Sequence, residues 1–117
     1  MDQLLKTNLT AAGVDVEAAV SRLMGNEALL ERLLRKFAAD ANFAALKAAV
    51  KDGNREQALA ASHTLKGMTG NLSMTVLFDL FSRQVEAIRG GDWERAVSLM
   101  DEITPARERV LSLIETL

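Results

Sequence analysis

The chain has 117 residues, a formal net charge of −2 and no cysteine. This length predicts a single domain, and a hydrophobic fraction of 49% is enough for a buried core. The small net charge gives no drive toward nucleic acid or anionic membranes. The absence of cysteine excludes disulfides and thiolate chemistry, and one histidine without cysteine argues against a zinc site. We therefore expect no metal, nucleic acid or membrane partner.

No apolar run approaches the ~20 residues that a membrane span needs. The start Met1-Asp2-Gln3 also lacks the basic region of a signal peptide. We therefore expect a cytoplasmic protein. Aromatic residues make up only 4% of the chain and proline occurs once, so we expect an all-α fold with a core of Leu, Ala, Val and Met.

Helix signals begin near the N-terminus. Residues 1–13 are weakly patterned and fit either a short helix or a flexible tether. Asp15 is placed to cap a short helix that runs to about Met24. Asn26 is placed to cap the next helix, which we expect to reach Asp52-Gly53, a length of about 25 residues or about 37 Å. Apolar side chains recur along it at helical spacing: Leu30, Leu33, Leu34, Phe37, Ala41, Ala44, Ala45 and Ala48.

Three further helical stretches follow. Asn54 opens a helix with the expected inward face Ala58, Ser62, Leu65, Thr69 and Leu72. The next helix ends at Gly90-Gly91, and its expected inward residues are Val76, Leu77, Leu80, Phe81, Val85 and Ile88. Asp92 is placed to cap the last helix, where Pro105 predicts a kink near Met100–Asp101. Its buried stripe comprises Ala96, Leu99, Met100, Ile103, Val110, Ile114 and Leu117.

Short connections between long amphipathic helices imply antiparallel neighbours. The sequence therefore predicts an all-α fold, an antiparallel up-down four-helix bundle with an additional short N-terminal helix. The chain divides into an N-terminal segment, residues 1–13, and a bundle domain, residues 14–117.

His63 is the only histidine. Residues three, four and seven positions later share its helical face, so His63 looks along one surface at Lys66, Gly67 and Gly70. A glycine inside a helix costs roughly 0.8–1 kcal/mol relative to alanine. Either these positions keep space for a large partner, or a glycine allows close helix packing, or Gly70 helps to end the helix. A core histidine is the weaker alternative, because Lys66 shares the stripe.

Two other residues are candidates for the same site. Gln84, with Arg83 beside it, lies on the following helix and is placed to orient or screen the imidazole. The alternative is an ordinary solvated polar face. Leu59 lies one turn before His63 on the same face, where it is either an exposed docking residue or a buried one.

The run His63-Thr64-Leu65-Lys66-Gly67, followed by Asn71-Leu72, resembles the signature of the histidine-containing phosphotransfer (HPt) domain of multistep two-component signalling. The family usually has glycine after the motif leucine, whereas this chain has Ser73. The resemblance runs from about Val14 to the C-terminus, and it includes the stretches 14–19, 25–30 and 89–94.

The resemblance implies a phosphorelay carrier rather than an enzyme. By this resemblance we expect His63 to accept and donate a phosphoryl group between receiver-domain aspartates, and an imidazole lone pair is suited to that covalent storage. The resemblance implies response-regulator receiver domains as partners, and it also allows a hybrid sensor kinase. The chain itself binds no cofactor, and Mg²⁺ is expected on the receiver. We expect a monomer, with phosphoryl- or partner-binding roles for Lys66, Gly67, Gly70, Gln84 and Leu59.

Two other functions remain as alternatives. One is a helical adaptor that binds receivers or other signalling partners without being phosphorylated. The other is an inert structural bundle, which leaves the two helix glycines unexplained. The intact triplet His63, Lys66 and Gly67 favours the carrier, since an adaptor has no need for it.

Overall fold

The computed structural model describes residues 1–117 and is all-helical, which confirms the predicted all-α class. None of its helices has the length and apolar character needed to cross a membrane. The eight helices are α1 (Gln3–Ala11), α2 (Val16–Arg22), α3 (Glu27–Ala39), α4 (Asn42–Lys51), α5 (Arg55–Asn71), α6 (Thr75–Arg89), α7 (Trp93–Ser98) and α8 (Met100–Ile114).

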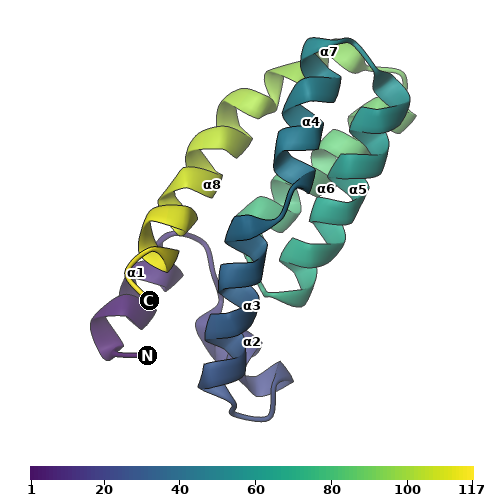
Figure 1. Cartoon of the computed structure of the whole chain (residues 1–117). Helices are drawn as coiled ribbons and strands as arrows, with labels where there is room; N and C mark the ends of the chain where they lie inside the picture. Colours follow the sequence, from purple (N-terminus) through teal and green to yellow (C-terminus); the bar gives the residue numbers. More distant parts are fainter.

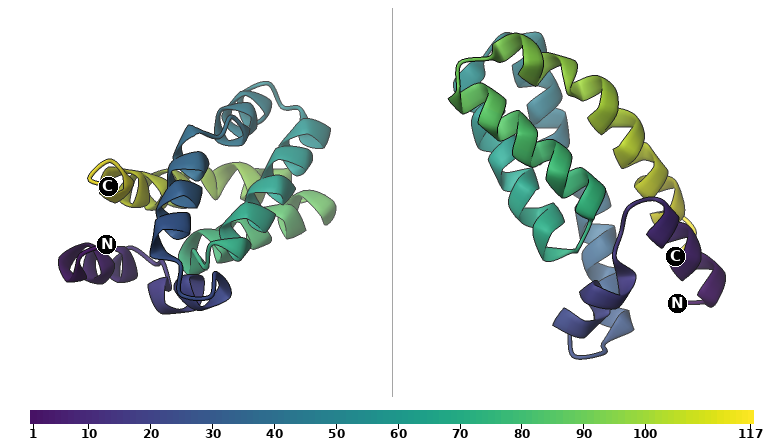
Figure 2. Two further views of the ribbon diagram at one scale, coloured as in Figure 1. Left: turned by 60° about the horizontal axis from the view of Figure 1, so that its bottom comes forward. Right: turned by 180° about the vertical axis from the view of Figure 1, so that it is seen from behind.

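The molecule is elongated, with extents of 42 × 23 × 21 Å. Figure 1 shows α3 and α4 following one another along its length, with α5 and α6 on one side and α8 on the other. The most extensive helix contacts are those of α5 with α6 and with α4. The short helices α1 and α2 lie at one end, where both termini are close together (Figures 1 and 2). Helix α5 is therefore packed between α4 and α6.

Side-chain caps set five of the helix starts, and the sequence predicts four of them. An oxygen of each capping residue accepts a hydrogen bond from the backbone N–H three residues later, which satisfies a donor that has no partner within the helix. The four predicted capping residues and their distances are Asp15 (3.0 Å), Asn26 (3.0 Å), Asn54 (3.0 Å) and Asp92 (3.1 Å).

The prediction of one helix of about 25 residues between Asn26 and Asp52 is wrong. The chain leaves the helical conformation at Asp40, where ψ is 139°, and α4 starts two residues later. The Asp40 carboxylate accepts hydrogen bonds from the backbone N–H and the side-chain amide of Asn42, both at 2.8 Å. Aspartate competes with helical hydrogen bonding in this way, while the alanine-rich apolar pattern continues through the break and hides it.

The predicted last helix is also divided, because α7 and α8 are separated at Leu99. The interruption lies just before Met100–Asp101, where the sequence predicts a kink. Pro105 lies inside α8 and has no N–H to donate to the carbonyl of Asp101. Helix α8 nevertheless continues from Met100 through Pro105 to Ile114, so the division of the predicted helix lies at Leu99 rather than at Met100–Asp101.

Val76 is not inward-facing as predicted, since 42% of its surface is exposed. It lies in the first turn of α6, beside the connection between α1 and α2. A Cβ atom added to Gly13 would come within 2.6 Å of the Cβ of Val76, and Gly13 has φ +91°. The connection therefore covers Val76 from one side only.

The N-terminal segment is a helix rather than a flexible tether. Asp2 caps α1 by accepting a hydrogen bond from the N–H of Leu5 at 2.8 Å, and Leu9 is buried in the core. The ammonium of Lys6 lies 3.2 Å from a carboxylate oxygen of Glu27 at the start of α3. Hydrogen bonding to Lys6 lowers the pKa of Glu27. Helix α1 is thus fixed to the rest of the molecule by apolar packing and an ion pair.

Ser73 adopts a strained conformation in the turn between α5 and α6. Its φ is 53°, in the left-handed region that glycine accepts more readily. The residue is buried, and its hydroxyl has no hydrogen-bond partner. The HPt family usually has glycine at this position. In this chain the backbone there adopts the conformation that favours glycine, but the residue is a serine.

Replacing Ser73 with glycine should increase the free energy of unfolding by about 1–2 kcal/mol, because it removes both the left-handed strain and the unpaired hydroxyl. Chemical denaturation measures this change. The matched control is Met24→Gly, since Met24 has φ 57° but is 96% exposed. The free energy of unfolding should rise less in the control. A Ser73→Gly variant that is no more stable than the parent chain would contradict the claim that Ser73 is strained.

Candidate functional site

Helix α5 presents His63 at its midpoint. The helix starts at the Asn54 cap, and its buried residues lie on one side. His63 falls outside that side and is exposed, as the sequence predicts. The hydroxyls next to it are engaged elsewhere, because Ser62 donates to Gln84 and Thr64 donates to the carbonyl of Ala60. The imidazole is therefore open to an approaching group.

Lys66 lies one turn after His63 and is half-buried. It takes part in none of the ion pairs of the structure. The ammonium therefore has no acidic partner within the chain. A positive charge is thus available beside the imidazole to attract an anion.

Gly67 has open space around it. A Cβ atom added there would meet no other atom within 4 Å, apart from its own helical backbone. Close helix packing therefore does not explain this glycine. The helix carries the cost of a mid-helix glycine at a site where alanine would fit.

Gly70 is different, because the ring of Phe78 from α6 lies against it. A Cβ atom at Gly70 would lie 3.0 Å from both Cδ1 and Cε1 of that ring. The carbonyl of Gly70 also accepts a hydrogen bond at 2.8 Å from the guanidinium of Arg22 in α2. The structure therefore supports close helix packing as the reason for glycine at position 70. The helix continues past it to Asn71.

Gln84 does not lie on the surface beside the imidazole. It is fully buried, and its side chain makes hydrogen bonds to Ser62 at 2.8 Å and to the carbonyl of Ala96 at 3.0 Å. The solvated polar face is therefore wrong for this residue, and its side chain makes no hydrogen bond to His63 itself. Arg83 pairs with Asp79 at 2.8 Å and lines the groove between α6 and α8. The apolar positions of α6 surround Gln84 in sequence, so its burial follows the helix face.

Leu59 is half-buried. Its exposure lies between the exposed docking residue and the buried residue that the sequence leaves open. The C-terminal part of α5 borders a groove of about 430 Å³ between α2, α5 and α6, whose lining includes Arg22, Gly70 and Phe78. Phe78 is 39% exposed. Sequence reasoning missed Arg22 and Phe78, since only the fold brings the helices α2 and α6 to this end of α5.

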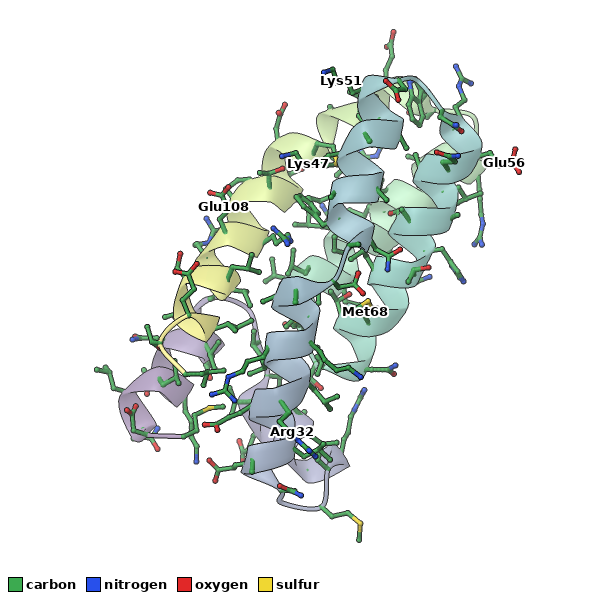
Figure 3. All side chains as sticks on the ribbon, viewed as in Figure 1. Arg32, Lys47, Lys51, Glu56, Met68 and Glu108 are labelled. Carbon is green, nitrogen blue, oxygen red and sulfur yellow. The ribbon has the colours of Figure 1, made fainter.

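Two further side chains of α5, Glu56 and Met68, lie in different surroundings. Figure 3 shows Glu56 extending away from the molecule near the start of the helix, and Met68 on the side that faces α3. Met68 packs against the core. No group of three or more His, Asp or Glu side chains is arranged to hold a metal ion. The site thus consists of an exposed imidazole, a cation one turn away and an open glycine position.

Comparison of the chain with models of known protein families, with curated proteins and with solved structures finds no match. The functional argument below therefore uses the geometry of the site and the resemblance of its motif.

The two glycines should respond differently to the same substitution. Gly67→Ala should raise the free energy of unfolding by about 0.8–1 kcal/mol, because it adds helix propensity in open space. Gly70→Ala should gain less or lose stability, because its methyl group must displace the Phe78 ring. Urea denaturation of both variants measures the difference.

A double variant tests the cause of that difference. Adding Phe78→Ala to Gly70→Ala removes the ring, so the alanine at position 70 should recover most of its helix propensity when compared with Phe78→Ala alone. Equal effects of alanine at Gly67 and Gly70 in the parent chain would contradict the packing role of Gly70.

Proposed function

We propose that this protein is a histidine phosphotransfer carrier. The observation that carries the proposal is the combination, on one face of α5, of exposed His63, unpaired Lys66 and open space at Gly67. The resemblance of the run from His63 to Leu72 to the HPt signature supports it. The proposed partners are receiver domains of response regulators and of a hybrid sensor kinase, in the cytoplasm.

The proposal includes a finer description of the fold. We assign α3 with α4, α5, α6, and α7 with α8 to the four positions of an antiparallel bundle, with α1 and α2 at one end. The contacts of α5 with α4 and α6, and of α6 with α8, support this assignment. The sharp connections at Gly53, Ser73 and Gly91, each with positive φ, return the chain along the same axis.

The transfer step needs little from the carrier beyond an accessible nucleophile. A ring nitrogen of neutral His63 bonds to the phosphorus of a receiver aspartyl phosphate, the P–O bond breaks, and the aspartate leaves as a carboxylate. The other ring nitrogen keeps its hydrogen. The reverse reaction passes the phosphoryl group to a second receiver. The receiver's Mg²⁺ supplies charge neutralisation for the transferred group.

Lys66 and Gly67 have distinct roles in this proposal. The Lys66 ammonium offsets the negative charge that the phosphoryl group brings to the helix surface. The missing side chain at Gly67 lets the loops that surround a receiver aspartate approach the imidazole. The cost of glycine in a helix is thereby explained by access.

The test of the site is His63→Gln. The variant should accept no label from a phosphorylated receiver, and its free energy of unfolding should stay within about ±0.5 kcal/mol, since His63 is exposed. Acid-labile radiolabel on the protein measures the first effect, and thermal unfolding measures the second. Glu108→Gln, at an exposed position on α8, is the control and should accept label normally.

Label retained by His63→Gln would show that another residue carries the phosphoryl group. A parent chain that binds receivers but never becomes labelled would favour the adaptor, the alternative function.

Two neighbouring variants separate charge from access. Gly67→Gln should fold normally yet slow phosphotransfer by at least about tenfold, because its side chain blocks the approach to His63. Lys66→Ala should also slow transfer, and its defect should shrink as salt rises, because salt screens the charge in the parent chain. Stopped transfer reactions at several salt concentrations measure both rates.

Ala44→Gln places the same side chain at an exposed position on α4 and is the control for Gly67→Gln. A Gly67→Gln variant that transfers at the parent rate would falsify the access role. A salt-independent defect in Lys66→Ala would exclude the charge role.

A further inference from the structure

A hydrogen-bonded polar cluster crosses the core next to the candidate site. The hydroxyl of Ser62 in α5 donates to the amide oxygen of Gln84 in α6 at 2.8 Å. The amide nitrogen of Gln84 donates to the carbonyl of Ala96 in α7 at 3.0 Å and lies 3.2 Å from the sulfur of Met100. Ser62 and Gln84 are both fully buried. The cluster links α5, α6 and α7 through a single side chain.

The packed face of α5 offers few other features that would fix its rotation. Apolar packing has no preferred direction, and alanine side chains are too small to interlock deeply with neighbouring helices. A hydrogen bond depends on both distance and angle. Among the buried residues of α5, only Leu65 has a large apolar side chain. The buried residues are Ala58, Ala61, Ser62, Leu65 and Thr69.

Ser62 immediately precedes His63, so the two side chains are about 100° apart around the helix axis. Any rotation of α5 that re-aims His63 also moves the Ser62 hydroxyl away from Gln84. The broken hydrogen bond would leave polar atoms unpaired inside the core, which is unfavourable. The buried bond and the exposed imidazole are therefore rigidly coupled.

Stability alone does not require the hydrogen bond between the two side chains, Ser62 and Gln84. When both partners of a buried hydrogen bond are replaced by apolar groups of similar shape, stability changes little or rises. Met has nearly the shape of Gln, and Ala removes only the hydroxyl of Ser. A core built from apolar residues at both positions would hold the helices together without fixing their rotation as tightly.

We propose that Ser62 and Gln84 are positioning residues, whose buried hydrogen bond fixes the rotation of α5 and the direction in which His63 meets the phosphoryl group of a docked receiver. This inference rests on the proposed carrier function. It gives Gln84 an effect on the imidazole through Ser62 and the helix backbone, without contact between the two side chains.

The test uses the full chain with the double substitution Ser62→Ala/Gln84→Met and two phosphoryl donors. Phosphoramidate is a small donor: its P–N bond breaks, ammonia leaves, and phosphorus bonds to the imidazole nitrogen. It can approach an exposed His63 from many directions, so its labelling rate should not change. Transfer from a phosphorylated receiver should slow at least about tenfold at saturating receiver concentration, because a docked partner requires one direction.

Thr69→Val is the matched control. Thr69 is also fully buried in α5, but its hydroxyl donates to carbonyls of its own helix, at 2.8 Å to Leu65 and 3.1 Å to Lys66. Its removal deletes a buried hydroxyl without disconnecting any helices. The control should transfer phosphate at the parent rate, and thermal unfolding should show the double variant folded. Ser62→Ala alone, which keeps the bond of Gln84 to Ala96, provides a milder version if the double variant unfolds.

A second measurement does not depend on phosphotransfer. The chain has no cysteine, so His63→Cys and Glu108→Cys allow two nitroxide labels to be placed specifically. The distribution of distances between the labels should broaden when Ser62→Ala and Gln84→Met are added, and it should stay narrow with Thr69→Val.

The outcomes separate the two proposals. An unchanged distance distribution, or receiver transfer at the parent rate in the double variant, overturns the positioning role. An equal loss of labelling from both donors also overturns it, because it shows general damage around His63. A parent chain that phosphoramidate labels but that exchanges phosphate with no receiver contradicts the carrier function, while the distance measurement still decides the positioning role.

Discussion

The packing of α5 between α4 and α6 is the constraint on which the candidate site depends. Its inward face consists mostly of small side chains, and the hydrogen bond from Ser62 to Gln84 at 2.8 Å lies within that face. Once these residues point inward, the opposite side of the same helix must face outward. His63, Thr64 and Gly67 are therefore exposed as a consequence of how the other side of the helix is buried.

The two glycines of α5 show how identical residues can have different physical causes. Both lie within a helix, and each has the same lower helix propensity relative to alanine. At Gly70 the cost is offset by contact with the Phe78 ring and by access of Arg22 to the carbonyl. At Gly67 no contact offsets it. A glycine without a structural reason, one turn from the only histidine, is the strongest pointer to function in this chain.

Polar side chains, more than apolar periodicity, decide where the helices begin and end. Asp15, Asn26, Asn54 and Asp92 each supply an acceptor for a free backbone N–H. Asp40 does the same for Asn42 and thereby divides a stretch whose apolar pattern is continuous. The bend that results lets α3 and α4 follow one another along the elongated molecule (Figure 1).

The sequence by itself determined the helical class, the four capping residues and the outward direction of His63. These features depend on local chemistry, on the helical period and on the choice of glycine, and all of them are encoded within a few residues. The same reasoning identified the stripe of Lys66 and Gly67, because residues three and four apart share a helix face.

Only the tertiary structure decided the rest. Gln84 is buried because it meets Ser62 and Ala96, which lie 22 and 12 residues away in the chain. Gly70 is a packing position because α6 places the Phe78 ring on it. Such contacts depend on how separate helices approach one another, and a helical pattern gives the direction of a side chain without naming its neighbour.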